Sequence, residues 1–141
     1  YMSTERQQQA VGYVRVATGE EIGTGAQVER HKHTIISYCL DSGLRLTHMI
    51  IDIGGRVGRG RALDLLVMER AAVLVVPSLA QLARRSAELG PMLGHYFCPP
   101  SGIAELVAVA EGIDTRTAAG RLAIDVLRCL ARFESEGVYH A

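Results

Sequence analysis

The segment Val-Gly-Tyr-Val-Arg-Val-Ala at residues 11–17 is short, rich in β-branched residues and almost entirely apolar. Such a run is typical of a strand that is buried on both faces of a sheet. Similar apolar runs at residues 46–51, 72–76 and 103–109 predict three more strands. Segments with helical periodicity separate these runs, so the sequence predicts an α/β protein whose strands are mostly parallel.

The first two helices are predicted from apolar residues at helical spacing and from residues that stop a helix. One is expected over residues 26–42, after a glycine-rich turn at 18–25, with Gly43 as its end. A second, short helix is expected over residues 62–70. The residues before it, 54–61, are so rich in glycine that we expect an irregular loop there.

The last two helices begin at residues with side-chain oxygens that favour helix starts. Ser78 is expected to cap a helix that Gly90-Pro91 breaks or kinks, because proline lacks an amide hydrogen. Thr117 is expected to cap a final helix over residues 118–136. Its apolar face suits self-association as a homodimer, and its members are Leu122, Leu127, Leu130 and Phe133.

The fold class that follows is a three-layer α/β/α arrangement around a mostly parallel sheet of four or five strands. We expect residues 1–141 to form one domain, with residues 1–10 flexible. Ligands of such sheets bind at the carboxyl ends of the strands. Residues 15–18, 52–61 and 77–84 are predicted to lie there.

Composition narrows the function classes. The chain has 141 residues, with 15 basic and 15 acidic side chains, so its formal net charge is zero. Nucleic-acid binding would therefore depend on a local patch and not on overall charge. No apolar run is long enough for a membrane span, and the three cysteines are widely spaced, so we expect a cytoplasmic protein without metal or cofactor.

Arginines near the predicted strand ends are the candidate ligands for an anion. Arg15 lies inside an apolar strand, where an unpaired charge is costly, so a structural ion pair and a phosphate contact are equally open. Arg56, Arg59 and Arg61 alternate with glycines that allow close approach of an anion, although a solvated loop is an equal alternative. Arg84, in the helix after the third strand, can also reach this edge.

Several short patterns occur in a fixed order along the chain. Residues 13–18 (YVRVAT) match Tyr-x-Arg-x-Ser-Thr except at the serine, and residues 52–54 (DIG) match the start of Asp-x-Gly-x-Ser-Gly. A short helix, ALDLLVM, is expected at 62–68. Residues 79–84 (LAQLAR) match Leu-Asp-Arg-Leu-x-Arg in part, and residues 113–121 (IDTRTAAGR) match Ile-Asp-Thr-x-Thr-x-x-Gly-Arg throughout.

In this order and spacing, the patterns resemble the catalytic domain of the serine site-specific recombinases, the resolvase and invertase family, over residues 11–136. The resemblance implies a resolvase-like fold with a long dimerising helix. It also implies that a serine hydroxyl attacks a DNA phosphodiester and forms a 5′-phosphoserine link. Arginines would stabilise the phosphorus centre without metal or nucleotide cofactor, and strands would be exchanged within a synaptic tetramer.

The chain departs from the family pattern at the residues that carry the chemistry. Ala17 stands at the position of the nucleophilic serine, and a methyl group cannot attack phosphorus. Thr18 is not expected to replace it, because successive side chains of a strand point to opposite faces. Ala80 and Gln81 stand where the family has aspartate and arginine. These departures predict a domain that does not cleave DNA.

The family-like arginines are retained only in part. Arg15 and Arg84 match family positions, and Arg56 stands at the position of a serine. The family's loop arginine aligns with Gly60, so Arg59 and Arg61 are alternative equivalents. Arg15, Arg56, Arg59, Arg61 and Arg84 are accordingly the predicted contacts to DNA phosphates.

Three functional hypotheses remain open. The preferred one is an inactive recombinase-like domain that serves as a dimerisation, regulatory or accessory module at DNA. The second is an active recombinase with a displaced nucleophile, Thr18 or Ser78. The third is a small phosphate-ligand-binding α/β module built on the arginine-glycine loop. Family members usually continue into a DNA-binding domain, and we expect no such domain within residues 1–141.

Overall fold

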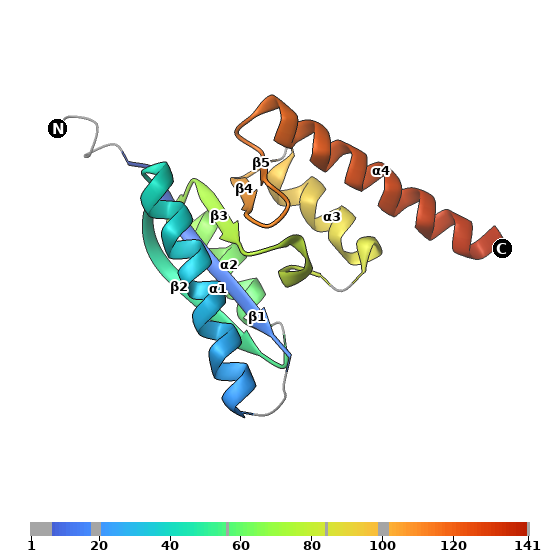
Figure 1. Cartoon of the computed structure of the whole chain (residues 1–141). Helices are drawn as coiled ribbons and strands as arrows, with labels where there is room; N and C mark the ends of the chain where they lie inside the picture. The colour runs from blue at the N-terminus through green and yellow to red at the C-terminus, as the bar shows by residue number, and fades with distance from the viewer. Residues whose placement is uncertain (1–6, 18–20, 56, 84, 99–101, 141) are drawn as a thin grey trace.

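The computed structural model describes residues 7–17, 21–55, 57–83, 85–98 and 102–140, with backbone alone for 21–24, 86 and 135–140. Within these ranges no helix is both long and apolar enough to cross a membrane. Strands and helices alternate through most of the chain (Figure 1). The elements are β1 (Gln9–Val16), α1 (Glu21–Ser42), β2 (Arg45–Ile53), α2 (Val57–Met68), β3 (Val73–Val76), the 3₁₀ turn η2 (Leu79–Gln81), α3 (Ser86–Phe97), β4 (Glu105–Ala108), β5 (Ile113–Asp114) and α4 (Ala118–His140).

The sheet has five strands in the order β2-β1-β3-β4-β5. The first four run parallel, and the two-residue strand β5 pairs with β4 in the antiparallel sense. The predicted α/β class, with four or five mostly parallel strands, is therefore confirmed. β5 is too short to produce a periodic signal of its own, which is why the sequence did not indicate it.

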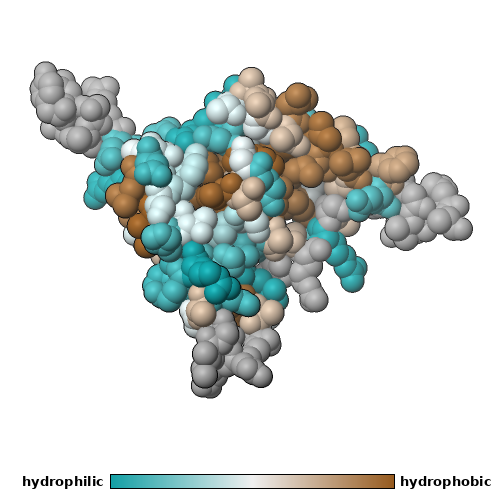
Figure 2. Space-filling model, in the orientation of Figure 1, coloured by the Kyte–Doolittle hydropathy of each residue, from teal (hydrophilic) through white to brown (hydrophobic). Residues whose placement is uncertain are grey.

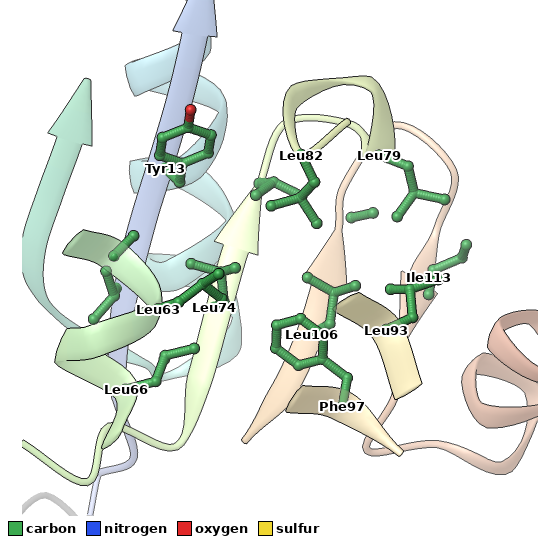
Figure 3. Packing of buried hydrophobic residues seen from close by; sticks show 14 of the residues in the cluster. Tyr13, Leu63, Leu66, Leu74, Leu79, Leu82, Leu93, Phe97, Leu106 and Ile113 are labelled. Carbon is green, nitrogen blue, oxygen red and sulfur yellow. The ribbon is translucent and has the colours of Figure 1, made fainter. Parts of the chain in front are cut away.

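Helices cover both faces of the sheet and complete the three layers. On one face, Tyr13, Leu74 and Leu106 of the strands pack against Leu66 of α2 and Phe97 of α3 (Figure 3). α4 packs against α3 on this same face of the sheet (Figure 1). On the other face, alternate residues of the same strands pack against α1. Val14, Val75 and Val107 pack with Ile35 and Cys39 there.

The amino-terminal boundary of the fold differs from the prediction. Residues 9 and 10, expected to be flexible, belong to β1, while residues 1–6 lie outside the described ranges. Ala10 is fully buried and pairs with Leu46 of β2 on one side and Val73 of β3 on the other. Strand pairing on both sides therefore places Ala10 in β1, although alanine has little preference of its own for a strand.

Two predicted glycine-rich loops turn out to contain helix starts. α1 begins at Glu21 and not at residue 26, and α2 begins at Val57, inside the expected loop 54–61. Both predictions gave glycine propensity too much weight, because its cost of roughly 1 kcal/mol per glycine is small enough for other contacts of a fold to override. For α2 the overriding contact is a carboxylate cap, described below. Gly43 ends α1 as predicted, with a positive φ of 69°.

The segment after β3 also differs from the prediction. Ser78 makes no side-chain capping bond, and it precedes the short turn η2 instead of a long helix. The Glu111 carboxylate accepts a hydrogen bond of 3.1 Å from the amide of Leu79. Glu111 therefore supplies the capping bond that was expected from Ser78. α3 then begins at Ser86 and contains Pro91, which does not end it. Packing of α3 against α4 offsets the lost hydrogen bond.

The start of α4 was predicted correctly. The Thr117 hydroxyl accepts a hydrogen bond of 3.0 Å from the amide of Gly120 and caps the helix, which continues to His140. Gly120 also has a spatial role. A Cβ atom at this position would lie 1.9 Å from the carbonyl oxygen of Asp114, so only glycine allows α4 to begin this close to β5.

Candidate functional site

The carboxyl ends of the strands bring the three predicted ligand-binding segments together. The amide of Gly54, after β2, donates to the carbonyl of Val16 at the end of β1, at 2.8 Å. The side chain of Gln81, in η2, accepts a hydrogen bond of 2.5 Å from the backbone amide of Arg15. Residues from β1, the β2–α2 connection and η2 thus meet at one edge of the sheet, where ligands of such sheets bind.

Asp52 organises this edge through three hydrogen bonds. Its carboxylate accepts from the hydroxyl of Tyr13 at 2.6 Å and from the amides of Gly58 at 2.9 Å and Arg59 at 3.2 Å. The two amides belong to the first turn of α2, which has no intrahelical partners for them. Asp52 therefore caps α2 and joins it to β1 and β2. The sequence carried no local signal for this cap, because the contact joins the end of β2 to the start of a different element.

The described arginines of the site differ in their surroundings. Arg15 is half-buried; its Nη2 donates to the Gly54 carbonyl at 3.4 Å, and its buried Nε has no partner among the described residues. Arg59 is half-buried, and its Nη1 donates to the carbonyl of Leu82 at 2.5 Å. Arg61 is exposed. The predicted contacts Arg56 and Arg84 lie outside the described residues.

The position expected for a nucleophile carries only a methyl group. Ala17 follows β1 directly and is exposed at the carboxyl edge. Ala80 is exposed in η2, next to the buried Gln81. Of the two displaced-nucleophile candidates, Thr18 lies outside the described residues, and Ser78 is half-buried at the end of the segment that follows β3. Both remain predictions.

A second polar cluster, which the sequence did not indicate, joins the amino-terminal segment to α1 and β5. Arg116 donates to Asp114 from Nε at 3.0 Å and from Nη2 at 2.8 Å, and from Nη1 to the Gln8 side chain at 3.1 Å. Tyr38 of α1 donates to Asp114 at 3.3 Å. Burial disfavours the Asp114 carboxylate, but the hydrogen bonds and charge of Arg116 outweigh burial and lower its pKa below the ordinary value. All polar atoms named here have partners, which indicates a structural role.

The predicted dimerisation residues of α4 fall into two groups. Leu122, Leu130 and Phe133 are 65%, 50% and 74% exposed. Leu127 is half-buried and packs against the chain's own core. Val126, also exposed, extends the first group at helical spacing. We call Leu122, Val126, Leu130 and Phe133 the α4 stripe, and apolar surface gathers where α4 lies (Figure 2).

Away from the carboxyl edge, the described residues form a cavity but no metal-binding cluster. Across the described ranges, no group of three or more His, Cys, Asp or Glu side chains could hold a metal ion. A cavity of about 350 Å³ has lining residues that include Ala72, Glu105 and Arg121. Glu105 opens β4 and Ala72 precedes β3, so this cavity lies at the amino ends of the strands, away from the edge described above.

Solved structures share this fold. The N-terminal catalytic domain of TP901-1 integrase has a TM-score of 0.75 and 20% identity, with 92% of this chain and 98% of that chain covered. A resolvase-family site-specific recombinase from Streptococcus pneumoniae has a TM-score of 0.77 and 21% identity, covering 94% and 91%. The catalytic domain of the IS607-like serine recombinase ISC1926 TnpA has a TM-score of 0.53 and 15% identity, covering 86% and 97%.

Sequence comparison gives the family. No curated protein matches the chain. The family model described as the resolvase N-terminal domain matches residues 10–139, which is nearly the whole chain. This match confirms the resemblance carried by the YVRVAT and IDTRTAAGR motifs. The chain therefore belongs to the resolvase N-terminal domain family of serine recombinases.

Proposed function

We propose that this domain associates with DNA and with a second copy of itself but does not cleave DNA, and that it acts as a regulatory or accessory module in recombination. The observation that carries the proposal is Ala17. An exposed methyl group stands at the end of β1, where the family resemblance places the nucleophilic serine. Phosphoserine chemistry needs a hydroxyl at this point, because the covalent intermediate forms on it.

Two further departures support a loss of cleavage beyond that of a single residue. Ala80 and Gln81 replace the aspartate and arginine of the family pattern. Gln81 carries no charge with which to stabilise a phosphorane, and its oxygen already accepts a hydrogen bond from the Arg15 amide. Restoring a serine alone would therefore leave the electrostatic part of the site incomplete.

The DNA-binding half of the proposal rests on the arginines at the carboxyl edge. The Arg15 side chain contacts Gly54 in the β2–α2 connection, and the Arg59 amide is capped by Asp52 at the start of α2. Arg61 is exposed one turn along from the start of α2. Guanidinium groups bind phosphate through paired donors. Because the chain's formal net charge is zero, such a local group is what would bind a phosphodiester backbone.

The self-association half rests on the α4 stripe. Four apolar side chains at helical spacing remain exposed on a helix that extends past α3 (Figure 1). Apolar patches of this kind mark interaction sites more often than free surface. A second copy of α4 offers the same stripe, so a two-fold arrangement covers both.

DNA association is tested by titrating a mixed-sequence duplex at low and high salt. We expect binding that weakens steeply with salt, because phosphate contacts release counterions. Arg15→Ala should weaken binding and lower the salt slope by about one. Arg45→Ala is the matched control, because exposed Arg45 begins β2 at the opposite edge of the sheet. No binding at any salt, or equal effects of the two variants, would count against the proposal.

Cleavage is tested without knowledge of a target site by incubating the chain with fragmented genomic DNA, denaturing it and searching for nucleotide attached to protein. We expect no adduct. An adduct that Thr18→Ala or Ser78→Ala abolishes would establish the displaced-nucleophile alternative instead. Ala17→Ser alone is expected to remain inactive, whereas Ala17→Ser combined with Ala80→Asp and Gln81→Arg should regain adduct formation if the three departures account for the loss.

A further inference from the structure

Gln81 fills a gap in the hydrogen bonding of the sheet. β1 pairs with β3 only as far as Gly12, opposite Val75, because β3 ends at Val76. β1 itself continues to Val16, so no residue of β3 is left to accept from the amide of Arg15. The Gln81 side-chain oxygen accepts there instead, at 2.5 Å. A side chain thus replaces the strand carbonyl that is missing.

Only some side chains can make this bond. Gln81 is 8% exposed, and a buried amide without an acceptor is costly. Arginine, which the family resemblance places here, has donors only and cannot accept from a backbone amide. The glutamine at position 81 therefore does more than remove a charged group. Its side chain accepts a hydrogen bond that the arginine of the family pattern could not accept.

The same segment holds Arg59. Leu82 follows Gln81 directly, and its carbonyl accepts from Nη1 of Arg59. The Leu79 and Leu82 side chains point into the hydrophobic core and anchor the segment to it (Figure 3). A continuous path of contacts therefore runs from the backbone of Arg15 through Gln81 and Leu82 to the guanidinium group of Arg59.

We propose that Gln81 is a positioning residue: by standing in for a β3 carbonyl it fixes the Leu82 carbonyl, which orients Arg59 beside Arg15 toward a phosphodiester backbone. This inference rests on the proposed DNA association and adds the residue that sets its geometry. A guanidinium group held by one fixed carbonyl keeps its remaining donors directed, which lowers the entropic cost of binding phosphate. Arg61 is exposed on the same helix, and no hydrogen bond from its side chain to another described residue supports it in this way.

The first test is independent of DNA. Gln81→Met keeps the side-chain volume but removes the acceptor, and Gln81→Glu keeps an acceptor. Hydrogen exchange at the Arg15 amide should become at least about tenfold faster in Gln81→Met and stay slow in Gln81→Glu. Equal protection of this amide in the parent and in Gln81→Met would overturn the inference.

The second test is a double-mutant cycle on affinity for a mixed-sequence duplex. Arg59→Ala should weaken binding about tenfold in the parent but no more than about threefold in Gln81→Met, because Arg59 is no longer oriented there. Arg61→Ala is the control, and its effect should be the same in both backgrounds. Additive effects of the Gln81 and Arg59 changes would overturn the inference while leaving DNA association intact. If the parent does not bind the duplex at all, the proposed function fails, and the exchange measurement alone decides whether Gln81 holds the segment.

Discussion

The hydroxyl of Tyr13 donates a hydrogen bond of 2.6 Å to Asp52, and so links the middle of β1 to the end of β2. Tyr13 is fully buried, so its hydroxyl needs an acceptor inside the protein. The same carboxylate accepts from the amides of Gly58 and Arg59. One side chain thus satisfies a core tyrosine and starts the helix that carries a candidate phosphate-binding arginine.

Gly58 leaves the space that this carboxylate occupies. A Cβ atom at Gly58 would lie 2.6 Å from Oδ1 of Asp52 and 2.8 Å from Cγ2 of Ile50, so Gly58→Ala must displace the cap. We expect the free energy of unfolding to fall by about 1–3 kcal/mol in Gly58→Ala. Gly60→Ala, on the same helix with nothing within 4 Å, should raise it by up to about 1 kcal/mol. Urea unfolding measures both, and equal effects would contradict the cap.

The ion pair of Arg116 and Asp114 predicts a pH dependence of stability. Because the folded pKa of Asp114 is lowered from its ordinary value of 3.8, its stabilising effect is complete above that value and is lost as the pH falls through the lowered pKa. Arg116→Gln should therefore reduce the unfolding free energy by about 1 kcal/mol at pH 6 and by much less near pH 2.

The matched control for this pair is Lys32→Gln, which removes a more exposed pair with Glu29. Its effect should stay within about 0.5 kcal/mol at every pH, because exposed pairs at helical spacing contribute little. Unfolding curves collected between pH 2 and pH 6 give both comparisons. A difference between parent and Arg116→Gln that did not shrink at acid pH would refute the assignment to Asp114.

The α4 stripe predicts the oligomeric state. Leu130→Ser with Phe133→Ser should raise the dissociation constant of a dimer at least tenfold, since burying each side chain is worth about 1.5–3 kcal/mol. Arg132→Ser, exposed between these two positions, is the control and should change little. Sedimentation equilibrium measures both. A parent chain that stays monomeric at high concentration would remove the basis for this prediction.

Cysteine reactivity provides a separate test of α4. Cys129 is exposed, whereas Cys39 and Cys98 are buried, and burial also raises the pKa of the Cys39 thiol. We expect one thiol per native chain to react quickly with a maleimide, and mass spectrometry of digested protein should find it at Cys129. Cys129 lies one residue before Leu130 of the α4 stripe, so dilution into the monomeric range should speed the reaction. Rapid labelling of Cys39 would contradict the packing of α1.

Part of the fold was readable from local patterns. The run at residues 11–17 predicted β1 because buried parallel strands are continuously apolar, and Thr117 predicted the start of α4 because its hydroxyl satisfies an amide three residues on. The helix starts at Glu21 and Val57 were not readable. Glycine opposes helix locally, and the cap that compensates for it at Val57 comes from a different element.

The sequence by itself determined the family, the order of the four parallel strands, and the absence of a hydroxyl at residue 17, since each depends on residue identity along the chain. Tertiary structure alone decided that Gln81 meets the amide of Arg15, 66 residues away in the chain, and that Arg59, not Arg61, is held by Leu82. Such contacts depend on where β3 ends and on how α2 is capped. No local pattern encodes those distances, because they arise only when separate elements pack.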